Sequence, residues 1–136
     1  MNVREIMTTN ITKASPESTL VYVATMMRDE NIGAVPIVDG NELTGIITDR
    51  DIVVRAVADG KDPSTTKVED ILSEELESVE PEADVTDAAD LMASRQIRRL
   101  PVVEDGQVVG MALLETLRLN TRMAPPLTLS KEFQKA

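Results

Sequence analysis

The chain has 136 residues, of which 42% are hydrophobic and 1% aromatic, and its 14 Lys and Arg against 24 Asp and Glu give a formal net charge of −10. A surface this acidic repels nucleic-acid backbones and anionic membranes, and one Tyr and one Phe cannot form a platform for stacking bases. Because Cys and His are absent, disulfides, thiolate chemistry, histidine-based triads and the commonest metal ligands are excluded.

The N-terminal residues lack the apolar stretch of a secretory leader, and no apolar run approaches the length that spans a membrane. We therefore expect a soluble, cytoplasmic protein that binds neither nucleic acid nor membrane. Without His, Cys or a second carboxylate placed for acid–base work, we expect no enzyme, no metal site and no obligatory cofactor.

The first sixty residues predict a leading segment, two helices and a hairpin. The leading segment, Val3–Met7, runs into an extended piece that ends at Ser15-Pro16, and Ser18 or Thr19 can cap the helix that follows. Apolar residues at helical spacing give this helix a core face of Leu20, Val23, Ala24 and Met27. Two short apolar strands are then joined through Asp39-Gly40-Asn41. The second helix passes through Ile52, Val53, Ala56 and Val57 and stops at Gly60.

The same pattern recurs 65 residues later. Residues Val3–Ile52 align with Val68–Leu117 without a gap, and ten of the fifty pairs are identical, where chance would give about three. The second copy has Asp84 as its candidate N-cap and Asp105-Gly106 as its hairpin turn. Its helix face consists of Val85, Ala88, Ala89 and Met92.

This duplication predicts an α/β (α+β) fold of two β-α-β-β-α repeats. Neither half, at near 60 residues, buries enough surface alone, so we expect the repeats to pack sheet to sheet with pseudo-twofold symmetry. The predicted boundaries are 1–60 for the first repeat, 61–67 for a linker, 68–120 for the second repeat and 121–136 for a C-terminal tail. That tail can cover the module, reach a partner or be loose.

The stretch Gly45-Ile46-Ile47-Thr48-Asp49-Arg50-Asp51 carries the functional signal. A strand that ends in Thr48 and a helix that begins near Asp51 place free amides, a hydroxyl and a carboxylate at one spot, which suits a phosphorylated sugar. The alternative is a capping box, in which Thr48 and Asp51 only satisfy the helix's own amides. The second copy has Leu113 and Thr116 at these places, so the fold does not require such a cap.

The repeat, the Pro36 and Pro101 strands and this motif resemble a pair of cystathionine-β-synthase (CBS) domains, or Bateman module, of the stand-alone bacterial or archaeal type. The resemblance implies that Thr48 and Asp51 hold the ribose and phosphate region of a ligand, with Asp51 on the ribose hydroxyls. It also implies that residues just before the Pro strand touch phosphate. The full set of implied ligand contacts is Gly45, Ile47, Thr48, Arg50, Asp51, Arg98, Arg99 and Pro101.

Because clefts in this family combine the motif of one half with the pre-strand residues of the other, the two predicted clefts differ. One joins Thr48 and Asp51 with Arg98 and Arg99. The other has neither charge, since it consists of Gly33, Ala34, Leu113 and Thr116. Alternatively, Arg95, Arg98 and Arg99 lie on a solvent-exposed surface and only balance the charge of nearby acidic residues. This is the better interpretation for Arg95.

The resemblance implies a regulatory module that senses an adenine nucleotide, AMP, ADP or ATP, in one cleft. The alternative is a nucleotide-free scaffold for dimerisation or partner docking. Related modules also bind S-adenosylmethionine or dinucleotides, but the arginines favour a phosphorylated ligand. We further expect a homodimer, formed by apolar helix surface beside the core stripe that includes Tyr22 and Met26.

Overall fold

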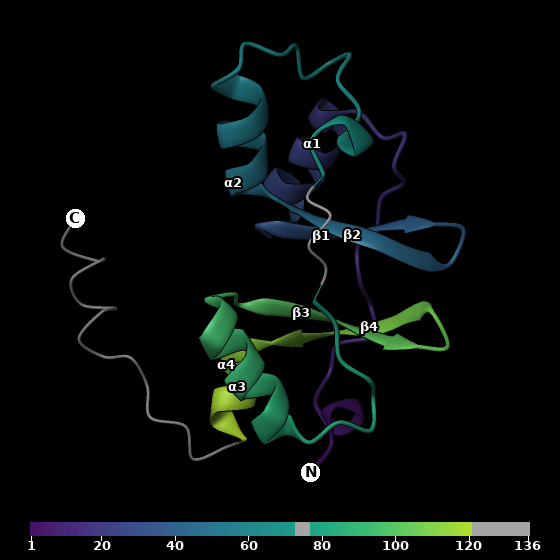
Figure 1. Ribbon diagram of the computed structural model, residues 1–136, viewed down its shortest axis with the longest axis vertical. Helices are drawn as coiled ribbons and strands as arrows, with labels where there is room; N and C mark the ends of the chain where they lie inside the picture. The colour runs from purple at the N-terminus through teal and green to yellow at the C-terminus, as the bar shows by residue number, and fades with distance from the viewer. Residues whose placement is uncertain (73–76, 121–136) are drawn as a thin grey trace, which may run out of the picture.

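A computed structural model of the chain describes residues 1–72 and 77–120. It consists of two similar halves, each with a β-hairpin covered by helices (Figure 1). The elements are α1 (Leu20–Glu30), β1 (Ala34–Asp39), β2 (Glu42–Thr48), α2 (Asp49–Ile52), α3 (Val85–Arg95), β3 (Arg99–Glu104), β4 (Gln107–Leu113) and α4 (Leu114–Leu119). A π-helical turn, Val53–Val57, continues α2, and 3-10 turns form at Val3–Glu5 and Val68–Asp70. The mixed class of helices with antiparallel strands is as predicted.

The C-terminal tail predicted for residues 121–136 lies outside the described residues. Within the part of the chain that the structure describes, no helix combines the length and apolarity that crossing a membrane requires.

Both long helices begin at the predicted caps. The Thr19 hydroxyl accepts the Tyr22 N–H at 3.2 Å, and the Asp84 carboxylate accepts the Thr86 N–H at 2.8 Å. The hydrogen bonds from Thr86 hold the pKa of Asp84 below its usual value. Each helix therefore has one of its free N-terminal amides satisfied by a side chain, which confirms the two N-caps.

The hairpins repeat one another in detail. Each contains a β-bulge at the residue pair after its proline, between Ile37 and Val38 and between Val102 and Val103. The extended piece predicted at the start of each repeat is a single parallel bridge, Ala14 to Ile37 and Val79 to Val102. These bridges lie along the edge of the hairpin that holds the proline, where the missing proline N–H breaks no ladder.

The buried hydrophobic residues form one core in each half. In the first half, Leu20, Val23 and Met27 of α1 pack on β1 and β2, and in the second half all four predicted residues of α3 are buried. One first-half prediction was wrong, because Ala24 is exposed, and the second helix passes through Val53 and Val57 as predicted but leaves both side chains exposed. Only the Ile52 and Ala56 face of the second helix reaches the sheet, and among the described residues no element covers the opposite face.

The hairpins meet at one position. β2 and β4 pair antiparallel through Glu42 and Gln107 alone, which gives the strand order β1-β2-β4-β3. The neighbouring Leu43 N–H donates to the Gly106 carbonyl at 3.3 Å. The halves are thus joined at the turn ends of β2 and β4, while the opposite strand ends, at Thr48 and Leu113, face a cleft between them.

The leading segments are exchanged between the halves. Val3 belongs to the core of the second half, where its N–H donates to the Ala83 carbonyl at 2.9 Å. Val68 belongs to the core of the first half, and its N–H donates to the Ser18 carbonyl at 2.8 Å. The boundaries of the repeats in the sequence therefore differ from the boundaries of the packed halves.

Two glycines at the same place in the repeats allow this exchange. A Cβ on Gly110 would lie 2.6 Å from the Met7 sulfur and 2.8 Å from the Thr8 carbonyl oxygen, and a Cβ on Gly45 would lie 2.8 Å from the Leu72 side chain. Met7 and Leu72 are themselves 65 residues apart. The glycine of each inner strand therefore makes room for the leading segment of the other repeat.

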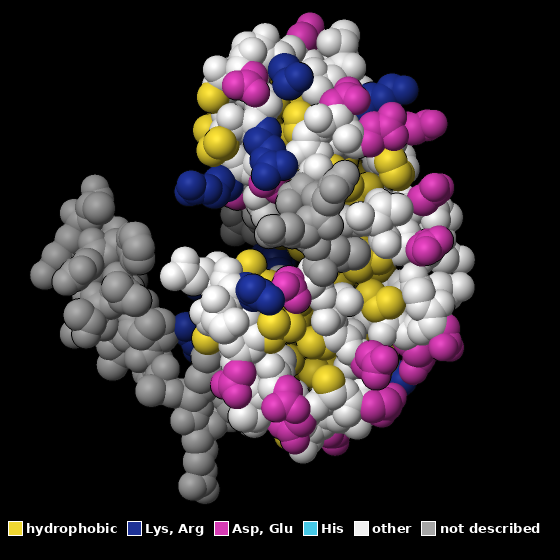
Figure 2. All heavy atoms as spheres, viewed as in Figure 1, with side chains coloured by type: hydrophobic (Ala, Val, Ile, Leu, Met, Phe, Trp, Pro, Cys, Tyr) yellow, Lys and Arg dark blue, Asp and Glu magenta, His cyan; other side chains and the backbone are white. Residues whose placement is uncertain are grey.

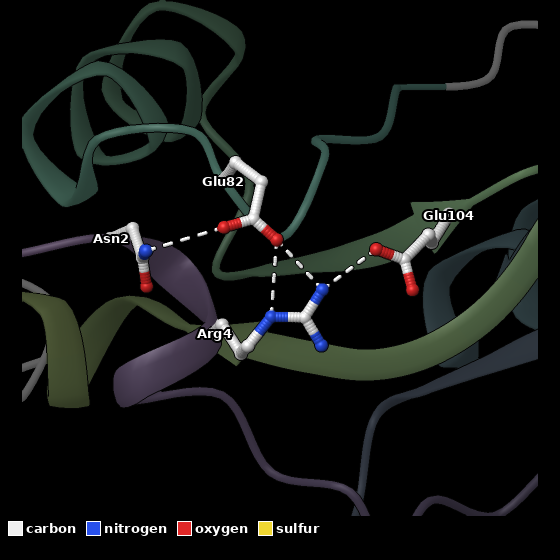
Figure 3. Close-up of polar contacts among 4 residues, drawn as sticks. All are labelled: Asn2, Arg4, Glu82 and Glu104. Atoms are coloured by element: carbon white, nitrogen blue, oxygen red, sulfur yellow. Dashed lines mark hydrogen bonds and ion pairs between the residues drawn. The ribbon is translucent and has the colours of Figure 1, made fainter.

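A polar cluster fastens the first leading segment (Figure 3). The Arg4 guanidinium donates to Glu82 at 2.7 Å and 3.1 Å and to Glu104 at 2.7 Å, and the Asn2 amide donates to the second oxygen of Glu82. The corresponding residues on the first half are Glu69, Glu17 and Asp39. The second leading segment thus lacks this arginine, and backbone hydrogen bonds and buried Val68 and Ile71 hold it.

We expect Gly110→Ala to destabilise the protein by about 1–3 kcal/mol, because the added methyl group overlaps backbone that cannot move without breaking the paired hydrogen bonds between Thr8 and Met111. Gly45→Ala is the matched control. The atoms nearest to its methyl group belong to the Leu72 side chain, which can move more easily than backbone, so we expect a change within about 1 kcal/mol. Urea unfolding of both variants measures the difference, and equal stabilities would contradict the steric role of Gly110.

Candidate functional site

A cleft of about 1280 Å³ separates the two halves. It opens as the hollow at the left of Figure 2, with Lys and Arg side chains near its mouth. The first half lines it with Gly33, Ala34, Ile46, Thr48, Asp49 and Arg50. The second half lines it with Glu77, Arg95, Gln96, Ile97, Arg98, Arg99, Pro101, Leu113, Leu114 and Glu115. The cleft thus contains residues from both of the clefts that the sequence predicted, joined into one space.

The motif residues Thr48 and Asp51 form a capping box at the start of α2. The Thr48 hydroxyl accepts the Asp51 N–H at 3.1 Å, and Asp51 Oδ2 accepts the Thr48 N–H at 2.9 Å. The capping box, which was the alternative interpretation of this motif, is therefore present. Within residues 1–72 and 77–120, Asp51 Oδ1 accepts no hydrogen bond, so one carboxylate oxygen remains available. The helix cap therefore uses the Thr48 hydroxyl and one Asp51 carboxylate oxygen as acceptors, and it leaves the other Asp51 oxygen able to accept a hydrogen bond.

The arginines of the second half enter the cleft at the start of β3. Arg98 is exposed and lies 3.5 Å from Glu115, a long ion pair between two exposed side chains. Arg99 is half-buried, and no ion pair to it occurs among the described residues. Arg95 is engaged with Glu77 at 2.9 Å, consistent with its interpretation as a charge-balancing residue.

The second half has no equivalent of the motif. Leu113 occupies the N-cap position of α4, and no side chain caps that helix. Thr116, the counterpart of Asp51, does not line the cleft. The fold therefore forms this helix without a capping box, and the hydroxyl and carboxylate of the first half are an addition to it.

Three of the predicted contacts do not line the cleft. Ile47 is fully buried in the core of the first half, Gly45 faces Leu72, and the Asp51 side chain is half-buried within its cap. The predicted residues that the structure brings together at the cleft are Thr48, Arg50, Arg98, Arg99 and Pro101.

Asp49 is the carboxylate that sequence reasoning missed. It lines the cleft, its N–H donates to the Gly33 carbonyl at 3.0 Å, and a Cβ on Gly33 would lie 3.1 Å from its Oδ2. Glycine at position 33, where the second half has Arg98, leaves space for this side chain. The close spacing of Asp49 and Asp51 in one motif was the available signal, but it did not indicate which carboxylate faces the cleft.

The cleft differs in charge from the rest of the protein. Among the described residues, four arginines and three carboxylates line it, Arg50, Arg95, Arg98 and Arg99 against Asp49, Glu77 and Glu115. The described lining therefore carries an excess of one positive charge in a chain of net charge −10. Such a local reversal favours an anionic group in the cleft over the surrounding surface.

Comparisons with known proteins agree with this architecture. The family model of the CBS domain matches the chain twice, over residues 3–57 and 68–118. CBS domain-containing protein YhcV of Bacillus subtilis is 41% identical over 119 residues, which cover 88% of this chain and 84% of that protein. Hypoxic response protein 1 of Mycobacterium tuberculosis is 35% identical over 108 residues, covering 79% and 76%.

Two of the solved structures that share the fold are similar to this chain as follows. The crystal structure of Hypoxic Response Protein I with two coordinated zinc ions matches with a TM-score of 0.81 and 32% identity, covering 92% of this chain and 100% of that one. The CBS domain pair of protein MJ0100, in complex with 5′-methylthioadenosine and S-adenosyl-L-methionine, matches with a TM-score of 0.77 and 29% identity, covering 89% and 100%. The present chain has no Cys or His, and its described residues contain no group of three acidic side chains placed to hold a metal.

Proposed function

The chain belongs to the CBS domain family, and from that premise we propose that it is a regulatory module that senses an adenine nucleotide, AMP, ADP or ATP, in the cleft between its halves. The observation that carries this proposal is the arrangement of Arg98 and Arg99 on one side of the cleft and Thr48 and Arg50 on the other.

The arginines select the phosphate. Arg99 is half-buried and without an ion partner among the described residues, and Arg98 has only its 3.5 Å contact with Glu115. A phosphate oxygen gives such guanidinium groups a charge-assisted, bidentate partner. Arg50, exposed at the opposite wall, adds positive charge. The ligand is therefore an anion, which separates it from the positively charged S-adenosylmethionine.

We assign the ribose hydroxyls to a carboxylate of the motif. Asp51 lies next to the lining residues Thr48, Asp49 and Arg50 and is not itself on the cleft wall. It retains Oδ1 as a free acceptor among the described residues while Oδ2 serves the helix cap, so the cap and a bond to a ribose hydroxyl are compatible. The complex of protein MJ0100 with two adenosine compounds supports an adenosine moiety in this family. Adenosine with phosphate fits both walls of the cleft.

The ligand acts by drawing the halves together. They are joined at Glu42 and Gln107, and the cleft lies at the other end of β2 and β4. A nucleotide that contacts Thr48 and Arg50 on one wall and Arg99 on the other binds the closed arrangement more tightly than the open one, which shifts the population toward closure.

The second candidate function is a nucleotide-free scaffold, which the exposed apolar side chains of the first half favour. We also propose that the protein is a homodimer under either candidate function, so its oligomeric state does not distinguish the two. Only nucleotide binding distinguishes the sensor from the scaffold.

Titration calorimetry with AMP, ADP and ATP tests the proposed function, after mass spectrometry has identified any small molecule released from denatured, freshly purified protein. We expect one nucleotide per chain, because only the first repeat brings a hydroxyl and a carboxylate, those of Thr48 and Asp49, to the described lining of the cleft from the start of its second helix. Two equivalent sites would contradict the single motif, and no heat and no thermal shift with any nucleotide would favour the scaffold.

The role of Arg99 predicts a selective loss of affinity for phosphorylated ligands. Arg99→Ala removes a charged hydrogen bond worth about 1.5–3 kcal/mol, so AMP binding should weaken about ten- to a hundredfold while adenosine binding is unchanged. Arg95→Ala is the matched control, with the same charge change at an arginine already engaged by Glu77. If both variants weaken AMP equally, only the general charge of the cleft matters.

The role of Asp51 predicts a loss of affinity without loss of fold. Asp51→Asn keeps an oxygen that can accept the Thr48 N–H, so the melting temperature should change little, but the hydroxyls of every ribonucleotide lose a charged acceptor. We expect affinity to fall about tenfold or more for AMP and much less for its 2′-deoxy analogue. Asp49→Asn is the comparison variant, and a larger loss there would assign the ribose to Asp49.

A further inference from the structure

Carboxylates lie beside two of the three arginines with which the second half lines the cleft. The Glu77 carboxylate is 2.9 Å from Arg95, and the Glu115 carboxylate is 3.5 Å from Arg98. Figure 2 shows both acidic and basic side chains around the cleft. In the part of the chain that the structure describes, Arg99 is therefore the only one of these three arginines without an ion pair.

The wall formed by the first half has no excess charge in its described lining. Asp49 and Arg50 are both exposed and both line the cleft, and Asp49 Oδ1 accepts the Arg50 backbone N–H at 2.8 Å. One carboxylate and one guanidinium thus follow each other on this wall. The single excess positive charge of the described lining comes from the second half, where Arg99 has no acidic partner.

The fold does not require the carboxylate of Glu115. Its counterpart 65 residues earlier is Arg50, and both residues lie in the first turn of a helix and line the cleft. The frame therefore accepts a charge of either sign at this position. The Glu115 side chain is 81% exposed, and among the described residues it accepts a hydrogen bond only from Arg98. Its charge thus bears mainly on Arg98 and on any anion that enters the cleft.

We propose that Glu115 makes the cleft selective for a nucleotide with a single phosphate group, AMP rather than ADP or ATP. This inference rests on the proposed function and narrows its ligand. One phosphate finds a charge-assisted, bidentate partner in Arg99. A second or third phosphate has to use an arginine of the described lining that already has a carboxylate beside it.

The selectivity is electrostatic. A phosphate group that reaches Arg98 also approaches the Glu115 carboxylate, and like charges a few ångströms apart repel each other. Each added phosphate increases the negative charge of the ligand, whereas the described lining offers an excess of only one positive charge. The net charge of −10 on the whole chain adds to the repulsion. The monophosphate is therefore the member of the series whose charge the cleft matches best.

Titration calorimetry of the full chain with AMP and with ATP, in the absence of divalent cations, measures this selectivity. We expect the wild type to bind AMP more tightly than ATP. Glu115→Gln keeps the size of the side chain and removes its charge, so the ratio of ATP affinity to AMP affinity should rise about two- to fivefold, the effect of one exposed charge pair. Glu115→Arg, which introduces the charge that the first half has at this position, should raise the ratio further. The melting temperature of both variants should stay close to that of the wild type.

Glu77→Gln is the matched control, because it makes the same charge change on the same wall beside an arginine that is held more closely. We expect it to change the ratio less than Glu115→Gln does. Equal changes in the two variants, or an unchanged ratio in both Glu115 variants, would overturn the role of Glu115. A wild type that binds AMP and ATP equally would overturn this inference alone, whereas a wild type that binds neither would overturn the proposed function as well.

Discussion

The exchange of the two leading segments is the constraint on which this fold depends. Each half completes its core with side chains from the leading segment of the other repeat, Val3 in one direction and Val68 with Ile71 in the other. Full burial of one such side chain contributes roughly 1.5–3 kcal/mol, so separating the halves would expose both cores at once. The repeats therefore cannot act as independent domains. Among the described residues, the strands of the two halves pair only at Glu42 and Gln107, at the strand ends opposite to those that line the cleft.

On this shared frame the two repeats differ in their surfaces. Gly33 faces the cleft where the second half has Arg98, and Thr48 precedes α2 where the second half has Leu113. Corresponding residues that pack against the exchanged segments, such as Gly45 and Gly110, are the same or similar in the two repeats. A duplicated fold can keep its exchanged segments only if both copies satisfy the same steric limits, whereas cleft and helix surfaces are free to differ. A single asymmetric ligand, with sugar at one end and phosphate at the other, suits such an asymmetric cleft.

The sequence predicted the parts of the fold that depend on local pattern. Helix faces, caps, turns and the 65-residue offset follow from spacing that is visible along the chain. It did not predict that Ala24 is exposed while its counterpart Ala89 is buried, because that depends on which neighbour covers each helix. Gly45 was assigned to ligand contact from its place in the motif, and its steric role became visible only with Leu72 beside it. Asp49 and Asp51 could not be distinguished for a similar reason, since helix geometry decides which carboxylate serves the cap.

The short helix α2 connects the cleft with the exposed surface of the first half. Its first turn, with Asp49 and Arg50, lines the cleft, and the π-helical turn that continues it exposes Val53 and Val57. Only a few residues separate these two features, and the helix between them is held to the core by Ile52 and Ala56. Because a close-packed core transmits displacements, a shift at Thr48 reaches Val53 and Val57 without a separate relay. A partner whose affinity depends on that shift must, by linkage, alter ligand affinity in turn.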